Sequence, residues 1–254
     1  MKGHWLSLLI GTFGLTLIFN PLAASADSQV FEASGATPAD IQTAVDTFRS
    51  FLGSNNGVGG TFTTGRREIN WDAVPDAFSA PNPLPANFFN SNSPRGVVFF
   101  TLGTGFQVSA NLMNLTNTPV RFGNINPVYP AIFSTFSPQR LFSALNSNIT
   151  ENLFFIPGTT QSATVKGFGA VFTDVNADQS TKIEYFDVAG NLLFSRNVLP
   201  GPTNRGSLSF LGVGFDTASV FLVRITSGNR ILNVPNRDVV VMDDFIYGEP
   251  QALP

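Results

Sequence analysis

Residues 238–250 read DVVVMDDFIYGEP, the last strand-like stretch of the chain. β-Branched and aromatic side chains, which favour strands, surround two adjacent carboxylates, Asp243 and Asp244. Successive side chains of a regular strand point to opposite faces, so Asp243 is expected to share a face with Phe245, and Asp244 with Ile246. At least one carboxylate then lies beside apolar packing, where a lone charge is costly unless it is paired or coordinated. A metal site, a catalytic pair or a structural device that closes a sheet would each explain these carboxylates.

Short apolar runs, separated by Gly, Pro, Asn and Asp, recur along the chain from residue 97 onward. They occupy residues 97–102, 106–110, 163–175, 181–199, 206–215, 218–228 and 238–248. The sequence contains 26 Phe, 23 Gly and 17 Pro residues, and only 12 % of its residues are charged. This pattern favours an all-β sandwich or barrel. Residues 103–105 and 188–191 are predicted to be hairpin turns, the first joining strands 97–102 and 106–110.

One amphipathic helix is predicted before these runs, as the first element of the mature chain. Thr37 is suited to the N-cap, Pro38 to the first helical position, and Asp40 to the third position of a capping box. Gly53 is suited to ending the helix. The apolar face is formed by Ile41, Val45, Phe48 and Leu52. We expect this helix to cover an open end or edge of the β structure, and a partner-binding helix is the alternative.

Residues 1–26 have the three-part layout of a secretory signal peptide. Lys2 and His4 precede a largely apolar run at residues 6–19, and a small-residue cleavage pattern ends at Ala26. The run is shorter than the roughly 20 residues that span a bilayer, although an uncleaved anchor is the alternative. Cleavage would leave no His and no Cys, because His4 is the only histidine and the chain has no cysteine.

The expected mature chain is weakly charged. Removing Lys2 from the 14 basic residues leaves 13 against 17 acidic residues. No basic stripe is present, which argues against a nucleic-acid partner. A cysteine-free exported chain also does not fit a small disulfide-stapled scaffold, so its stability must come from a core.

Residues 61–96 combine several prolines and asparagines with large aromatic side chains, among them Trp71, Phe78, Phe88 and Phe89. Proline and asparagine resist regular structure, but a disordered linker would lack the aromatics. We therefore predict an ordered loop pinned by aromatic side chains, with a binding groove as the alternative. The predicted organisation is a signal peptide (1–26), the helix and loop (27–95), a β-sandwich (96–250) and a tail (251–254), with 27–95 and 96–250 in one domain.

Motifs in the second half carry a resemblance to known proteins. The order GFGAVFTDV, IEYFDVAGNLL, FLGVGFD, VFLVRITSGN and VVVMDDFIYGEP resembles the exported bacterial jelly-roll modules of PEP-CTERM-type surface proteins and, more distantly, galactose-binding-like sandwiches. The stretches GRREINWDAVPDAF and GVVFFTLGTGFQVS resemble an uncharacterised family of secreted bacterial proteins with the same tail. The resemblance implies a jelly-roll-like antiparallel β-sandwich, and it implies no established activity.

The chain departs from the PEP-CTERM pattern at its end. Such chains end with Pro-Glu-Pro, a membrane-spanning segment and a basic cluster, whereas this one ends YGEPQALP. We therefore expect no membrane span after signal cleavage. The predicted location is extracellular, periplasmic or loosely attached to the cell surface.

The resemblance also implies a structural calcium ion near the last strand. Asp243 or Asp244 would be a ligand, Asp174 could contribute, and Asp178 is a weaker candidate. Calcium takes six to eight oxygen ligands, often carboxylates together with backbone carbonyls. The alternative is that these aspartates accept backbone hydrogen bonds or pair with an arginine, for which Arg224 is available.

Three classes of function remain open: an enzyme, a binding protein and a structural matrix protein. Without His or Cys the mature chain cannot build a Ser-His-Asp triad, a Cys-His pair or a usual zinc site. Carboxylate catalysis, as in a glycoside hydrolase, would need Glu68 or Asp72 to meet Glu151 or Glu184.

We instead expect a non-catalytic exported protein that binds a glycan or another envelope component. Asn70, Trp71 and Asp72 are the candidate ligand-binding residues, because aromatic platforms with planar polar groups recognise sugars. The alternatives are that Trp71 fills the core beneath the proline-rich loop, or that the protein is a structural matrix component without a small ligand.

Overall fold

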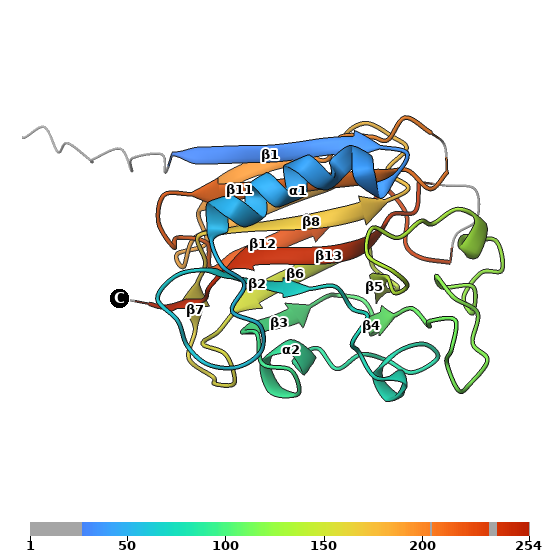
Figure 1. The fold of residues 1–254 in the computed structure, drawn as a ribbon, viewed down its shortest axis with the longest axis horizontal. Helices are drawn as coiled ribbons and strands as arrows, with labels where there is room; N and C mark the ends of the chain where they lie inside the picture. The colour runs from blue at the N-terminus through green and yellow to red at the C-terminus, as the bar shows by residue number, and fades with distance from the viewer. Residues whose placement is uncertain (1–26, 204, 234–237, 254) are drawn as a thin grey trace, which may run out of the picture.

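The structure, a computed structural model, describes residues 27–203, 205–233 and 238–253 (Figure 1). The predicted signal peptide, residues 1–26, lies outside the described residues. Strands account for 37 % of the chain and helices for 11 %, which confirms the predicted all-β class. Within the described residues, every helix falls short of the length and apolar character needed to cross a bilayer.

In the described residues, the strands form a seven-stranded sheet, a five-stranded sheet and a small two-stranded sheet, and the paired strands within each sheet are antiparallel. The seven-stranded sheet contains, in spatial order, β1 (Ser28–Gly35), β11 (Leu208–Phe215), β8 (Gly167–Thr173), β13 (Val241–Gly248), β5 (Phe142–Leu145) and β4 (Gly105–Val108), with β2 (Arg66–Ile69) also paired to β13. The five-stranded sheet contains β10 (Leu192–Asn197), β9 (Lys182–Phe186), β12 (Leu222–Thr226), β6 (Ile149–Phe154) and β3 (Val97–Phe100). The remaining elements are β7 (Ala163–Thr164), β14 (Gln251–Ala252), α1 (Pro38–Leu52), α2 (Phe88–Ser91) and the 3₁₀ turns Asp76–Phe78 and Tyr129–Ala131.

Eight of these strands follow the jelly-roll order. Counted along the chain from β5, and leaving β7 aside, the strands β5, β6, β8, β9, β10, β11, β12 and β13 take positions one to eight. One sheet then reads 1-8-3-6 and the other 2-7-4-5. This order of two four-stranded sheets is the jelly roll, as predicted. Strands β1, β2, β3 and β4 extend the two sheets at their edges or ends.

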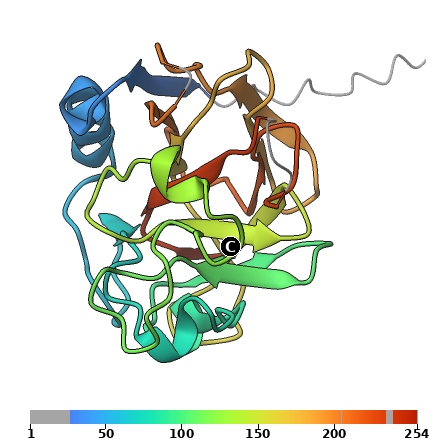
Figure 2. The ribbon, with the colours of Figure 1, turned by 90° about the vertical axis from the view of Figure 1, so that its right-hand side faces the viewer.

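The two sheets differ in how they are covered. Every residue of β8, β11 and β13 is buried, whereas burial alternates along β6, β9 and β12. The inner faces of both sheets form the main core. Helix α1 packs on the outer face of the seven-stranded sheet beside β1 (Figures 1 and 2). Within the described residues, the outer face of the five-stranded sheet, called the open face below, has no such layer.

The prediction of α1 is confirmed in detail. Thr37 and Asp40 form the capping box, and the four predicted apolar residues are the buried ones. Two glycines of β11 let the helix lie close to the sheet. A Cβ atom at Gly212 would lie 2.9 Å from the Phe48 ring, and one at Gly214 only 2.1 Å from the Phe51 ring. Larger side chains there would push the helix away from the sheet.

Two predictions about strand order are wrong. Strands β3 and β4 do not form a hairpin, because β3 pairs with β6 in one sheet and β4 pairs with β5 in the other. The turn that joins them therefore crosses between the sheets. The first element after residue 26 is strand β1, not the helix, and all eight of its residues pair with β11. The predicted turn at residues 188–191 is confirmed between β9 and β10.

Candidate functional site

The two adjacent carboxylates lie at a bulge in β13. Met242 pairs with Phe172 and Phe245 pairs with Ala170, so Asp243 and Asp244 together face a single residue of β8. Met242 and Phe245 both belong to the main core between the sheets. The extra residue breaks the alternation of the strand and leaves both carboxylates on the outer face. The expectation that they point to opposite faces is therefore wrong.

One serine contacts both members of this carboxylate pair. The Ser137 hydroxyl lies 3.2 Å from Oδ1 of Asp243 and 2.7 Å from Oδ1 of Asp244. The backbone N–H of Phe136 donates to Oδ2 of Asp243 at 2.7 Å. Arg49, from helix α1, places its guanidinium 3.5 Å from Oδ2 of Asp244. A hydroxyl carries only one hydrogen, so this serine cannot donate fully to both carboxylates.

Burial sets the protonation of the pair, because Asp243 is 0 % exposed and Asp244 is 4 % exposed. Burial raises the pKa of Asp243 well above its ordinary value, and the negative charge of Asp244 raises it further. Burial also raises the pKa of Asp244, while the Ser137 hydrogen bond and Arg49 lower it. The pair therefore retains a proton that a solvated aspartate would lose.

The residues proposed as a sugar site lie beside this pair. The indole N–H of Trp71 donates to the backbone oxygen of Asp243 at 2.7 Å. The Ser137 hydroxyl lies 3.5 Å from the backbone oxygen of Asn70, and Oδ1 of Asp72 accepts the N–H of Arg140 at 3.1 Å. Burial raises the pKa of Asp72. The candidate ligand-binding residues and the carboxylate pair, which were predicted separately from the sequence, thus lie next to each other in the fold.

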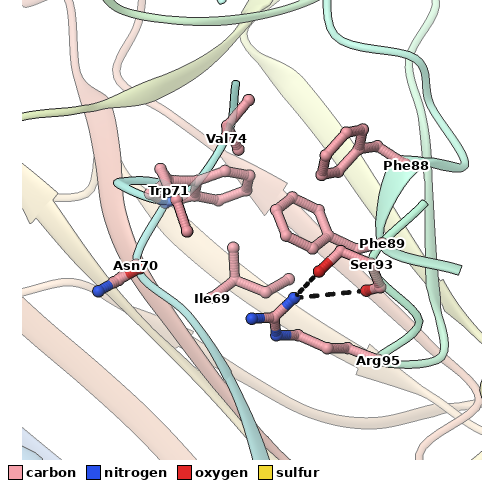
Figure 3. A pocket seen from close by; sticks show the side chains of 9 residues that line it. Ile69, Asn70, Trp71, Val74, Phe88, Phe89, Ser93 and Arg95 are labelled. Atoms are coloured by element: carbon pink, nitrogen blue, oxygen red, sulfur yellow. Dashed lines mark hydrogen bonds between the residues drawn. The ribbon is translucent and has the colours of Figure 1, made fainter. Parts of the chain in front are cut away.

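Trp71 is placed as a core residue and is only 1 % exposed. Its ring stacks on Phe142 at a centroid distance of 4.2 Å. The cavity beside it, of about 20 Å³, is bounded by Phe88, Phe89 and Arg95, and Asn70 points away from it (Figure 3). That volume holds one water molecule and not a sugar ring. The geometry therefore favours the core alternative for this tryptophan.

Asp174, the third proposed calcium ligand, is not grouped with Asp243 and Asp244. Asp174 follows β8, is buried, and accepts the N–H of Gly206 at 3.3 Å. Burial raises the pKa of Asp174 to about 6, and the charge of Asp238 adds to the rise. Asp178 is exposed. In the part of the chain that the structure describes, no group of three or more acidic or histidine side chains is placed to hold a metal ion. Calcium binding stays a prediction.

Two other partners predicted from the sequence are separated by the fold. Arg224 lies on β12 in the opposite sheet and pairs with Glu151, so Arg49 and not Arg224 is the cation beside Asp244. Glu68 contacts Arg49 on the outer face of the seven-stranded sheet, at 2.9 Å. Glu151 and Glu184 are on the open face, across the sandwich. The catalytic pairs that combine Glu68 with either of them are therefore not assembled.

The open face carries two rows of side chains that the sequence analysis did not identify. Strand register places one apolar side chain from each of five strands in a row: Val98, Leu153, Leu222, Phe186 and Leu192. The neighbouring row contains Phe100, Glu151, Arg224 and Glu184. These rows could have been suspected from the sequence, because the outward positions of β9 and β12 include large apolar residues and not only polar ones.

The charged row is ordered by a close ion pair. Arg224 donates from Nε and Nη2 to one oxygen of Glu151, at 2.8 and 2.6 Å. Its guanidinium carbon also lies 5.3 Å from the centre of the Phe186 ring. Lys182 pairs with Glu184 at 2.9 Å. The open face therefore presents fixed planar polar groups beside aromatic and aliphatic side chains.

Comparisons with protein-family models, with curated proteins and with solved structures find no match to this chain. The resemblance of its motifs to exported bacterial jelly-roll modules stays a prediction. Any function must therefore be inferred from the geometry of the carboxylate pair and of the open face.

Proposed function

We propose that this chain is a non-catalytic exported protein that binds carbohydrate through the open face. The observation that carries the proposal is the difference between the two sheets. The outer face of the seven-stranded sheet is covered by α1, whereas the open face leaves an apolar row partly exposed beside a charged row. A β-sandwich with one solvated face needs polar residues there, and large apolar residues on that face need another explanation.

The side chains of the open face match the chemistry of a sugar. Phe100, which is 49 % exposed, offers an apolar surface to the C–H groups of a sugar ring. The Arg224 Nη1 makes no hydrogen bond within the described residues, so its donors are free for hydroxyl groups. Five strands spaced by about 4.8 Å make a face about 19 Å across, which suits an extended oligosaccharide.

The exported location is part of the proposal and follows from the predicted signal peptide. An extracellular or periplasmic protein meets the polysaccharides of the cell envelope, and the low net charge of the chain does not favour a strongly charged partner. A structural matrix protein, which would self-associate without binding glycans, is the competing proposal.

A glycan array and polysaccharide pull-down test the proposal with two matched variants. Phe100→Ala removes an aromatic side chain from the open face, and Phe62→Ala removes one that is similarly exposed, at 43 %, from the loop before β2. We expect Phe100→Ala to weaken binding about tenfold, as loss of one buried apolar contact does, and Phe62→Ala to bind as wild type.

Arg224→Met supplies a second test on the charged row. It removes the hydrogen-bond donors and keeps much of the side-chain volume, so we expect binding to fall while the fold persists. The proposal is rejected if wild type binds no glycan, or if Phe100→Ala and Arg224→Met both bind like Phe62→Ala. Self-association in light scattering without glycan binding would favour the matrix alternative.

A further inference from the structure

A loop between β4 and β5 holds three large apolar side chains in solvent. It covers residues 111–118, with the sequence NLMNLTNT, and leaves β4 on the right of Figure 1. Leu112 is 75 % exposed, Met113 is 85 % exposed and Leu115 is 90 % exposed. Single exposed apolar residues are common on proteins, but three within four positions on one loop are not explained by chance exposure alone.

The loop is held in this shape by its polar residues. The Asn114 side chain donates to the backbone oxygens of Asn111 and Thr118, at 2.7 and 2.9 Å. It also accepts the N–H of Thr118 at 2.8 Å. Two further bonds tie the loop to the body, from Leu112 N–H to the side chain of Gln139 and from Leu115 N–H to that of Asp76. The apolar side chains are thus presented outward by a fixed backbone.

The segments that flank the loop in the sequence carry no carboxylate. Residues 77–150 contain three arginines and no aspartate or glutamate. The nearest acid in the contacts of the loop, Asp76, pairs with Arg140 at 2.6 Å. Arg121 donates to the backbone oxygens of Pro130 and Phe133, at 3.0 and 2.8 Å. Residues 111–118 contain no charged side chain, so placing the loop tip in an apolar medium strips water from no charge of its own.

The shape of this region favours lipid over a protein partner. A groove of about 340 Å³ lies beside the loop, and its lining includes Leu112, Asn114, Pro119 and Pro130. A stable protein interface buries about 1,200–2,000 Å² and involves roughly 20 residues from each side. Three side chains on a protruding loop offer much less area, but they are sufficient to enter the interfacial region of a bilayer.

We propose that the 111–118 loop inserts Leu112, Met113 and Leu115 into a lipid surface and so attaches the protein to a membrane without spanning it. The attachment is mainly apolar. It is therefore expected on zwitterionic and on anionic membranes alike, and it is expected to persist at high salt.

Co-sedimentation with phosphatidylcholine vesicles, and with vesicles that also contain phosphatidylglycerol, tests this inference. Replacing Leu112, Met113 and Leu115 together by Ser is expected to lower vesicle binding at least about tenfold, because each side chain loses its apolar contribution. Leu102→Ser is the matched control, since Leu102 is 85 % exposed on a different loop. Circular dichroism and thermal unfolding should show the same fold for all three proteins.

Residues 1–26 are apolar enough to bind lipid themselves, so each protein is tested both as the full chain and as the form that begins at Asp27. A second readout is the fluorescence of Met113→Trp, which should shift to the blue on adding vesicles, while that of Leu102→Trp should not. Four results would overturn the inference. The first two are no vesicle binding by the form that begins at Asp27, and equal vesicle binding by wild type and the triple variant. The other two are binding that requires anionic vesicles and is abolished by salt, and a dimer in the absence of lipid that the triple substitution converts to a monomer.

Discussion

Replacing Asp243 by Asn tests whether the carboxylate pair shares a proton. A protonated carboxyl group and an amide have nearly the same shape and donor pattern. The introduced amide could accept the N–H of Phe136 through its oxygen and donate from its nitrogen toward Asp244, as the protonated acid does. We therefore expect the variant to fold normally and to lose the pH dependence that belongs to this residue.

The size of the effect follows from the direction of the pKa shift. The folded chain holds a proton on Asp243 at pH values where the unfolded chain, with a pKa near 3.8, has lost it. Stability is therefore present at low pH and is lost as the pH rises toward the raised pKa of the folded state. Over that interval the free energy of unfolding of wild type falls by about 1.4 kcal/mol per pH unit relative to Asp243→Asn. Below pH 3.8, where both the folded and the unfolded chain hold the proton, the two should differ by only about 1 kcal/mol, the net worth of a rearranged hydrogen bond.

Urea unfolding at pH 5, 6, 7 and 8 measures this difference. Fluorescence is a suitable probe, because Trp71 is the only tryptophan in the described residues and its indole donates to the backbone of Asp243. Asp178→Asn makes the same chemical change at an exposed position and is the matched control. The difference between wild type and Asp243→Asn should grow with pH, and the difference between wild type and Asp178→Asn should not.

Two results would refute this reasoning. If Asp243→Asn is less stable than wild type by a constant amount at every pH, the carboxyl group is ionised in the folded state and the shared proton is wrong. If added calcium raises the unfolding midpoint of wild type but not of Asp243→Asn, the predicted calcium site is present and the pair holds a metal ion instead.

Three further changes are predicted to alter stability, each measured by urea unfolding. Trp71→Ala should lower the free energy of unfolding by about 3–5 kcal/mol, because the ring is fully buried and stacked on Phe142. Asp174→Asn should stabilise the protein at pH 8 by up to about 3 kcal/mol and should not stabilise it at pH 4. The reason is that the pKa of Asp174 is raised to about 6, so the stability that its bound proton contributes is lost as the pH rises through that value. A stability difference that does not change with pH would contradict this. Arg67→Met should cost about 3–5 kcal/mol by leaving Glu249 buried and unpaired, and adding Glu249→Met should restore most of the loss.

Helix α1 could be predicted from the sequence because its signals are local. The capping box needs only Thr37 and Asp40, three positions apart, and the buried face repeats every three or four residues. The jelly-roll-like sandwich was implied by the resemblance of the motifs in the second half to known modules. The separation of β3 and β4 into different sheets was not, because each strand has the same periodicity whichever partner it pairs with.

The candidate site was predicted in part. The residue types around Asp243 and Trp71 marked the right region, but the bulge was missed because strict alternation was assumed along β13. Ser137 and Arg49 could not be identified, since they lie far from Asp244 in sequence and only the folded chain brings them near it. The rows of the open face likewise depend on strand register, which a single sequence does not specify.

The pairing of β1 with β11 has a consequence for how the polypeptide acquires its structure. Ser28 pairs in register with Phe215, so β1 is synthesised long before its partner strand β11 has emerged. Until then the apolar stripe of α1 also lacks the surface on which it docks. The growing chain therefore carries an exposed, apolar amino-terminal segment until β11 becomes available. Assembly of this flank is a late event, and truncated products that stop before residue 208 should aggregate or be degraded.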